Sequence, residues 1–308
     1  MNAPHETDVL VVGAGPSGVA AALMAASLNL RTAVVEAASV GGKLHAIGAL
    51  ENVSGNWTTG PQLAEALASD LDRLQQAGRC SVIRARAVSV TGYDDRADLV
   101  LDDGRVLSAQ VVVVATGVST MAPPEADWIS APEQPSVPLL WRTGPADLTD
   151  RTYVLGADRP LGTWLRTHPH SPTTLHVLCP PADDYKISEV SGDERVRVVP
   201  VSQVALSPAP DGDGWSLLVK DRQGERTSYV STTVLSNLGS KPAALDGLAL
   251  SEDGYCPPGK QHPRIRTAGD LRAAQFQRIA TGQGSGAEAV LAAYYATVPS
   301  GSVHVTGP

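Results

Sequence analysis

The N-terminal stretch Val9-Leu10-Val11-Val12-Gly13-Ala14-Gly15-Pro16-Ser17-Gly18 decides the fold class of this chain. It is a short apolar run of strand character that stops at three glycines spaced G-x-G-x-x-G. A helix-favouring run over 19–26 follows, and a second apolar run over 32–35 ends in Glu36. Strand, glycine turn, helix, strand and carboxylate in this order form the dinucleotide-binding fingerprint of a βαβ unit.

Each part of this fingerprint has a physical role. Gly13 makes the tight turn, Gly15 lets the backbone approach a pyrophosphate, and Gly18 lets the helix pack on the strand. Pro16 and Ser17 begin the helix, whose free N–H groups meet the phosphate charge. Glu36 is placed to accept hydrogen bonds from an adenosine ribose. We therefore predict a dinucleotide site at this turn.

Composition and charge indicate a globular protein that does not bind nucleic acid or cross a membrane. A chain of 308 residues, 43% of them hydrophobic, is long enough for about two domains. The formal net charge of −8 argues against nucleic acid or an anionic membrane as the main partner. No apolar run reaches the length of a membrane span, and Cys80, Cys179 and Cys256 form no C-x-x-C. We expect a cytoplasmic protein with reduced thiols and no metal centre.

The chain up to residue 117 is predicted to complete this unit and to add a small antiparallel meander. Gly41 and Gly42 open a loop that allows close backbone approach to a ligand, and Pro61 opens an amphipathic helix over 62–76. Strands are predicted over 80–90, 97–101, 105–109 and 111–114. The last of these runs into the small-residue turn Ala115-Thr116-Gly117.

The same order of elements is predicted a second time. The Pro-rich stretch 118–149 is interpreted as a connection. A strand ending at Gly156, a short helix near 161–166 and further strands follow, over 174–179, 196–206, 215–220, 227–230 and 232–239. The chain is therefore predicted to be an α/β protein with two Rossmann-like units, each carrying a small meander.

The C-terminal part repeats neither unit. The strand Ile265-Arg266-Thr267 is followed by Ala268-Gly269-Asp270. The glycine-rich run 282–286 is interpreted as the entry to a helix over 287–295, which is a second place where backbone N–H groups can face an anion.

Three motifs together resemble the low-molecular-weight thioredoxin reductases, a family of two-domain flavoproteins. They are the Gly13-to-Glu36 fingerprint, the segment Gly41-Gly42-Lys43-Leu44 with Glu51-Asn52-Val53-Ser54-Gly55, and Thr267-Ala268-Gly269-Asp270 with the 282–286 run. The resemblance implies two three-layer Rossmann-like domains, the second inserted into the first. The FAD domain would comprise 1–117 and 243–308, and the pyridine-nucleotide-type domain 118–242.

The resemblance also implies where FAD binds. The pyrophosphate would meet the first glycine turn, Lys43 and Asn52 would lie near the flavin, Val88 would offer backbone to the adenine, and Asp270 would hold the ribityl chain. The full set of implied cofactor-binding residues is Gly13, Gly15, Pro16, Ser17, Gly18, Glu36, Gly42, Lys43, Leu44, Asn52, Val88, Thr116, Gly117, Asp270, Gln277, Arg278 and Ile279.

Two departures from the family pattern bear on function. Leu139-Leu140-Trp141-Arg142 stands where the family has its redox C-x-x-C, so no thiol pair is available to attack and resolve a disulfide. In the second glycine motif, Asp158 replaces the glycine that admits the pyrophosphate. The segment 179–184 has Asp183 and Asp184 where the family usually carries basic residues for a 2′-phosphate, although Asp183 could instead accept from the ribose of NADH.

We therefore expect an FAD-dependent oxidoreductase that passes electrons directly through its flavin from a donor other than NADPH, either a ferredoxin-like protein or a small molecule. One alternative is an NAD(P)H-dependent reductase of a small disulfide or quinone. Another is a non-catalytic flavin-binding or redox-sensor protein. No catalytic residue is assigned, and the resemblance implies a homodimer. Trp57, Trp141 and the tail with His304 are each candidates to cover the flavin, with the filling of a domain seam or a free tail as the alternatives.

Overall fold

The chain folds into two units in the computed structural model, which describes residues 7–132, 135–210 and 212–297. One unit contains the residues up to Ser119 together with those from Pro242 onward, and the other is Thr120–Lys241. The first unit is therefore built from two separate stretches of chain. The tail with His304 lies outside the described residues.

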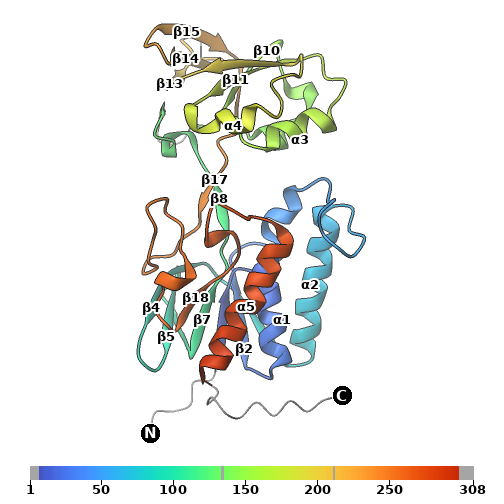
Figure 1. The fold of residues 1–308 in the computed structure, drawn as a ribbon, viewed down its shortest axis with the longest axis vertical. Coiled ribbons are helices and arrows are strands. Elements are labelled where there is room, and N and C mark those ends of the chain that lie inside the picture. Colours follow the sequence, from blue (N-terminus) through green and yellow to red (C-terminus); the bar gives the residue numbers. More distant parts are fainter. Residues whose placement is uncertain (1–6, 133–134, 211, 298–308) are drawn as a thin grey trace. The chain divides into compact units, whose positions relative to one another are not determined.

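Five parallel strands form the centre of the first unit (Figure 1). In spatial order they are β18 (Ile265–Thr267), β7 (Val111–Val114), β1 (Val9–Val12), β2 (Thr32–Glu36) and β3 (Cys80–Arg84). β1 is central, so its four residues are buried on both faces of the sheet. This is why the N-terminal stretch reads as a continuous apolar run and not as an alternating one.

Side-chain alternation along β1 divides the core of this unit into two layers. Val9 and Val11 pack toward α1 (Pro16–Ser27), α2 (Gly60–Gln76) and α5 (Ile279–Thr297), which cover one face of the sheet (Figure 1). Leu10 and Val12 pack toward the meander of β4 (Ala87–Gly92), β5 (Ala97–Leu101) and β6 (Val106–Ala109). Each fully buried aliphatic side chain contributes about 1.5–3 kcal/mol relative to exposure.

The glycine run at 282–286 lies inside α5 and does not precede it, because the helix begins at Ile279. The predicted helix start at residue 287 is therefore wrong. The run has a packing role: a Cβ on Gly286 would lie 1.9 Å from the carbonyl oxygen of Ser17, and one on Gly282 would lie 2.9 Å from the Ser17 hydroxyl. Glycines therefore let α5 approach the first turn of α1 closely.

This packing predicts opposite effects for two neighbouring substitutions. We expect Gly286→Ala to lower the free energy of unfolding by about 2 kcal/mol, because the new methyl group forces α5 away from α1. Gly284→Ala is the matched control, since its Cβ would meet nothing within 4 Å, and we expect it to stabilise the helix by about 0.5–1 kcal/mol. Thermal unfolding followed by circular dichroism measures both, and equal effects would refute the close-packing role.

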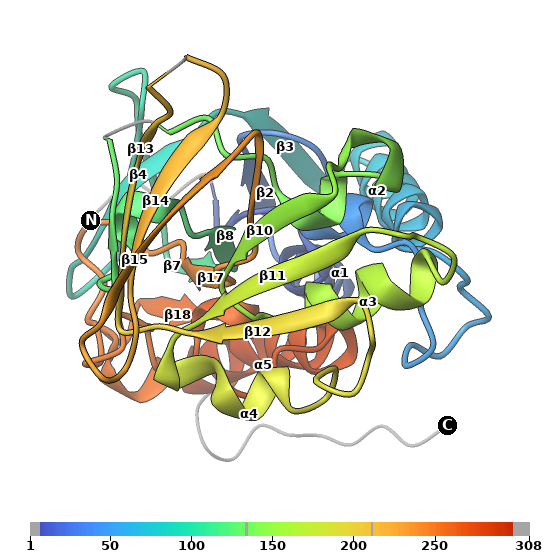
Figure 2. The ribbon, with the colours of Figure 1, turned by 90° about the horizontal axis from the view of Figure 1, so that it is seen from above.

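The second unit repeats the plan of the first, as its parallel strands show (Figure 2). Their order is β12 (Val196–Pro200), β11 (Thr174–Cys179), β10 (Arg151–Leu155) and β16 (Thr233–Ser236), which matches β3, β2, β1 and β7. α3 (Pro160–Thr167) packs on one face and the meander of β13 (Gln203–Pro208), β14 (Trp215–Lys220) and β15 (Arg226–Ser231) on the other. The predicted α/β repeat is confirmed.

Several predicted strand limits need correction. The 80–90 run is two strands in two sheets, because β3 joins the parallel sheet and β4 starts the meander. The 196–206 run likewise divides into β12 and β13. The 118–149 connection contains β8 (Val118–Thr120), which pairs with β17 (Ser240–Pro242), and β9 (Ile129–Ser130), which pairs with β13. Such short strands leave no periodicity in the sequence.

The remaining elements are short. α4 (Asp184–Ile187) is a single turn after β11, and brief 3-10 turns join the longer elements. Within the described ranges, no helix has both the length and the apolar character needed to cross a membrane.

Candidate functional site

The first glycine turn joins β1 to α1 with three glycines in three distinct environments. Gly13 has φ of 95°, and a Cβ there would lie 2.7 Å from the Ala115 carbonyl oxygen. A Cβ on Gly18 would lie 1.8 Å from the Gly13 carbonyl oxygen. Gly15 differs, because its backbone is extended and a Cβ would meet nothing within 4 Å. Gly13 and Gly18 are thus required by the fold itself, whereas the space at Gly15 is open.

Glu36 ends β2 beside this turn and organises it. Its Oε2 accepts a hydrogen bond from the backbone N–H of Ala14 at 2.6 Å, and its Oε1 accepts one from Ala38 at 2.7 Å. The carboxylate therefore lies at the carboxyl edge of the sheet, against the glycine turn, which is where an adenosine ribose lies in dinucleotide folds. Pro16 is the first residue of α1, and the Ser17 hydroxyl lies against Gly269 and Gly282.

Asp270 is the second carboxylate of this edge. It lies in a 3-10 turn, Gly269–Leu271, directly after β18, and the N–H of Gly269 donates to the Ser285 hydroxyl at 2.8 Å. Burial raises the pKa of Asp270, and the positive charges of Lys43 and Arg278 lower it in part. Lys43, which is remote in sequence, and Arg278 therefore both lie near this carboxylate. A half-buried carboxylate of this kind is suited to accept hydrogen bonds from ligand hydroxyls.

The loop after β2 brings Lys43 to Asp270. Gly41 and Gly42 both have positive φ, and the 3-10 turn Gly42–Ala46 follows. Leu44 in this turn is buried in the core, so only its backbone can face a ligand. Asn52 is exposed in the next loop, and Trp57 packs partly buried against the core of its own unit.

The other implied residues have mainly structural contacts. The Gln277 amide donates to the Tyr255 hydroxyl and to backbone carbonyls, and Ile279 packs against the core as the first residue of α5. Val88 lies at a bulge of β4, where its carbonyl accepts from Asp246. Thr116 and Gly117 both form hydrogen bonds with Ala243. The Thr116 hydroxyl donates to the Ala243 carbonyl, and the Gly117 carbonyl accepts from the Ala243 N–H, so these bonds join the two stretches of this unit.

The second glycine turn, after β10, is closed by side chains. The N–H of Gly156 donates to the carbonyl of Leu178 on β11, just as the N–H of Gly13 donates to the carbonyl of Val35 on β2. Gly156 therefore corresponds to Gly13, and Asp158, two residues later, corresponds to Gly15. The Lys186 ammonium lies 3.0 Å from a carboxylate oxygen of Asp158 and 3.0 Å from one of Asp183. We call these three residues the Asp158–Lys186–Asp183 cluster.

Asp183 completes the closure. Its Oδ2 accepts a hydrogen bond from the Ala157 N–H at 2.9 Å, just as Glu36 accepts from Ala14 in the first unit. Asp183 is 8% exposed and therefore not available to a ribose. Lys186 lies two residues beyond the segment 179–184 and was not among the residues predicted from the sequence. The i,i+3 spacing of Asp183 and Lys186 on a helical turn was the available signal.

The segment Leu139–Arg142, which the sequence predicts to stand in place of a redox C-x-x-C, contributes one side chain to the core of the second unit. Leu139 pairs with Ser236, Leu140 is fully buried, and the Arg142 guanidinium lies 4.5 Å from the centre of the Trp141 ring. All three cysteines of the chain lie in described parts, and each is free and buried. Burial raises the pKa of Cys80 and, with help from Asp183 and Asp184, that of Cys179 to about 11. Such thiols are poor nucleophiles at neutral pH.

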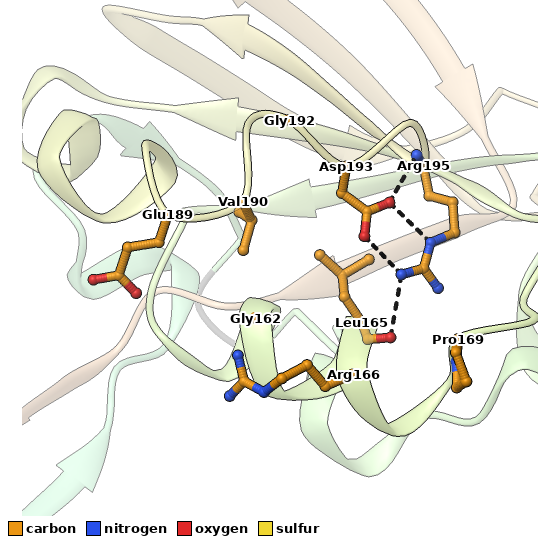
Figure 3. Close-up of a pocket in the computed structure, with 9 residues that line it drawn as sticks. All are labelled: Gly162, Leu165, Arg166, Pro169, Glu189, Val190, Gly192, Asp193 and Arg195. Atoms are coloured by element: carbon orange, nitrogen blue, oxygen red, sulfur yellow. Dashed lines mark hydrogen bonds and ion pairs between the residues drawn. The ribbon is translucent and has the colours of Figure 1, made fainter.

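A pocket of about 520 Å³ lies between α3 and the loop that precedes β12 (Figure 3). Two of its charged side chains pair with each other, because Arg195 bonds Asp193, and Arg195 also donates to the carbonyl of Leu165. Its lining residues are Gly162, Leu165, Arg166, Pro169, Glu189, Val190, Gly192, Asp193 and Arg195. Within the described ranges, no group of three His, Cys, Asp or Glu side chains is placed to hold a metal ion.

An open glycine turn with two carboxylates at the carboxyl edge of a parallel sheet defines a dinucleotide-binding protein. Residues 7–132 match the pyridine nucleotide-disulphide oxidoreductase family. The chain is 32% identical over 111 residues to a subunit of alkyl hydroperoxide reductase in Staphylococcus aureus (strain NCTC 8325 / PS 47), and 34% identical over 112 residues to thioredoxin reductase of Mycoplasma pneumoniae. Each match covers 36% of this chain, but only 21% and 34% of those proteins.

Solved structures extend the likeness to the whole fold. Thioredoxin reductase from Lactococcus lactis matches with a TM-score of 0.75 at 19% identity, covering 94% of this chain and 98% of that one. Thioredoxin reductase from T. acidophilum matches with a TM-score of 0.69 at 20% identity and the same coverage. The chain thus has the thioredoxin reductase fold, and its residues 7–132 match the pyridine nucleotide-disulphide oxidoreductase family.

FAD is the cofactor of this family, and the first unit fits it. The open space at Gly15 admits a pyrophosphate, whereas Asp158 fills the matching position of the second unit. The half-buried Asp270 carboxylate has two cationic neighbours but accepts no hydrogen bond through its side chain from the described residues, which leaves it free for ligand hydroxyls.

Proposed function

We propose that this protein is an FAD-dependent oxidoreductase with the thioredoxin reductase fold, in which electrons enter and leave directly at the flavin. The donor is a ferredoxin-like protein or a small molecule and not NADPH, and no disulfide takes part. The single observation that carries this proposal is the contrast between the two glycine turns, one open at Gly15 and one closed by the Asp158–Lys186–Asp183 cluster.

The proposed cofactor contacts follow from the first unit. FAD, when bound, supplies the electron-transfer chemistry of its isoalloxazine ring. The turn at Gly13 to Gly18 and the N-terminus of α1 would hold the pyrophosphate, Glu36 the adenosine ribose, and Asp270 the ribityl hydroxyls. Lys43 and Arg278, whose positive charges act on Asp270, would place positive charge near the ring and favour its reduced, anionic form.

The second unit supports the exclusion of NADPH. Asp158 puts a carboxylate where the pyrophosphate of a dinucleotide would lie, and like charges a few ångströms apart repel by several kcal/mol in a partly buried site. Lys186 does not reverse this, because its single positive charge is shared by two carboxylates. The absence of reactive thiols supports direct transfer, since each free cysteine is buried and has a raised pKa.

Anaerobic reduction of the reconstituted holoprotein tests the proposal. The oxidised flavin absorption band is followed after addition of NADPH, NADH or reduced ferredoxin, with photoreduction as the positive control. We expect reduced ferredoxin to bleach the band within seconds and NADPH to leave it unchanged over minutes. Rapid bleaching by NADPH or NADH would favour the pyridine-nucleotide reductase alternative. Bleaching by photoreduction alone would favour a non-catalytic flavoprotein, and a protein that binds no FAD would refute the cofactor assignment.

A further inference from the structure

A group of cationic side chains lies in the second unit, toward the amino ends of its parallel strands. Arg151 is the first residue of β10, His176 the third of β11, and Arg197 the second of β12. The glycine turn and the Asp158–Lys186–Asp183 cluster follow the carboxyl end of β10. This second group, which we call the Arg151–His176–Arg197 site, therefore lies toward the other end of the same strands, away from the glycine turn.

Strand register places the three side chains on one face of the sheet. His176 is the direct partner of Tyr153 on β10 and of Arg197 on β12. Arg151 lies two residues before Tyr153, so it points to the same face. Adjacent strands are about 4.8 Å apart, which is well within the reach of an arginine side chain. This is the face that the meander covers, because Tyr153 belongs to the core between the sheet and β13 to β15.

Aromatic rings form the wall beside these cations. The Tyr153 ring is buried, with its centre 5.2 Å from that of His176 and 5.2 Å from that of Tyr229 on β15. These contacts fix the imidazole against the sheet and leave it half-buried, while both arginines remain exposed at the surface. The site is therefore rigid at its centre and open to solvent at its rim.

The cations have no protein counter-charge in the described residues. Neither Arg151 nor Arg197 forms an ion pair there, including with Asp150 and Glu194, their nearest acids in sequence. In the part of the chain that the structure describes, Arg151 and Arg197 are the charged groups that act on His176; burial first, and then these two positive charges, lower its pKa. Like charges on neighbouring strands destabilise a sheet, so their convergence without an acid is unfavourable unless an anion is bound.

We propose that Arg151, His176 and Arg197 form a binding site for a dianionic phosphate group. Two guanidinium groups offer paired N–H donors that match phosphate oxygens. The imidazole on the strand between them, once a bound dianion favours its protonated form, supplies a third charge-assisted donor. A dianion suits three cationic donors better than a single carboxylate does. The Tyr229 ring beside the site would accommodate the body of a phosphorylated metabolite.

Phosphate titration of the full-length protein tests this site without any reliance on the proposed redox function. Protein labelled with carbon-13 at its histidines is titrated with inorganic phosphate against potassium chloride of equal ionic strength, with the His176 signal assigned from His176→Gln. We expect phosphate to raise the pKa of His176. Arg151→Gln and Arg197→Gln should each weaken phosphate binding about tenfold, and the double variant should abolish it.

The control is Arg166→Gln, an exposed arginine of α3 on the other face, which should leave phosphate binding unchanged. The double variant alone should also raise the pKa of His176 without phosphate, because two positive charges are removed. AMP is titrated in parallel: tighter binding than inorganic phosphate indicates a phosphorylated metabolite, and equal binding indicates the free ion. If phosphate acts equally on the wild type and the double variant, it is an adventitious ion only and the site is refuted.

Discussion

Gly15→Asp is expected to weaken FAD binding by about two orders of magnitude or more while leaving the fold intact. The substitution copies into the first unit the residue that stands at the same position of the second. Gly15 has φ of −73° and ψ of −175°, which any residue adopts, and its Cβ would meet nothing within 4 Å. The new carboxylate would face the pyrophosphate, so we expect affinity to fall by about a hundredfold or more, which corresponds to ~2.7 kcal/mol.

Two further variants separate charge, size and folding at this turn. Gly15→Ala adds only a methyl group, so a smaller loss of affinity is expected from it than from Gly15→Asp. Gly18→Ala should instead destabilise the protein, because its Cβ would overlap the Gly13 carbonyl oxygen at 1.8 Å. Titration of the apoprotein with FAD, followed by flavin fluorescence, gives the affinities, and thermal unfolding of the apoproteins gives the stabilities. Wild-type affinity in Gly15→Asp would show that the pyrophosphate lies elsewhere.

Lys186→Met is expected to destabilise the second unit by about 2–3 kcal/mol. The Lys186 side chain is 19% exposed, and the side chains of Asp158 and Asp183 beside it are 24% and 12% exposed, the latter slightly more than the Asp183 residue as a whole. Without the ammonium, two nearby carboxylates would repel each other with little water to screen them. Partial exposure keeps the expected loss below that of a fully buried ion pair.

Lys241→Met is the matched control, because Lys241 pairs with Glu125 at the surface and each side chain is more than a third exposed. We expect it to cost less than about 1 kcal/mol. Tryptophan fluorescence during urea unfolding is a suitable probe, since four of the five tryptophans lie in the second unit: Trp128, Trp141, Trp164 and Trp215. An equal loss in both lysine variants would contradict the role assigned to the cluster.

The pH dependence provides an independent check on Lys186. Burial alone would lower its pKa, but Asp158 and Asp183 outweigh burial and raise it above the usual 10.5. A raised folded-state pKa means that the ammonium stabilises the protein fully below pH 10.5 and that this contribution disappears as the pH rises through the folded value. The difference between wild type and Lys186→Met should therefore be constant near neutral pH and shrink only in strong alkali.

Local sequence patterns were sufficient to predict the elements in which each residue's role depends on its immediate neighbours in the chain. The run Val9 to Val12 predicted a buried parallel strand, and the glycine spacing after it predicted the turn. The repeat of the plan in the second unit was also predictable, because the same order of strand, turn, helix and strand returns. The helix over 60–76 was readable from its leucine spacing and from Pro61 near its start.

Local patterns failed where a residue's role is set by a distant partner. The glycines of α5 resembled a helix entry, and only the nearness of Ser17 shows that they serve helix packing. β8 and β9 are too short to carry periodicity and exist because β17 and β13 offer backbone partners. Lys186 was not among the predicted residues, because its partner Asp158 follows β10 whereas Lys186 lies in α4, after the next strand.

Residues adjacent in the chain were therefore enough to establish the fold class, the open glycine turn and the absence of a C-x-x-C. Only the folded chain shows what closes the second turn and what gathers around Asp270. Folding also brings Arg151, His176 and Arg197 onto one face of a sheet. The physical reason is that electrostatic interactions depend on distance in space, and the sequence does not show which residues far apart in the chain become neighbours on folding.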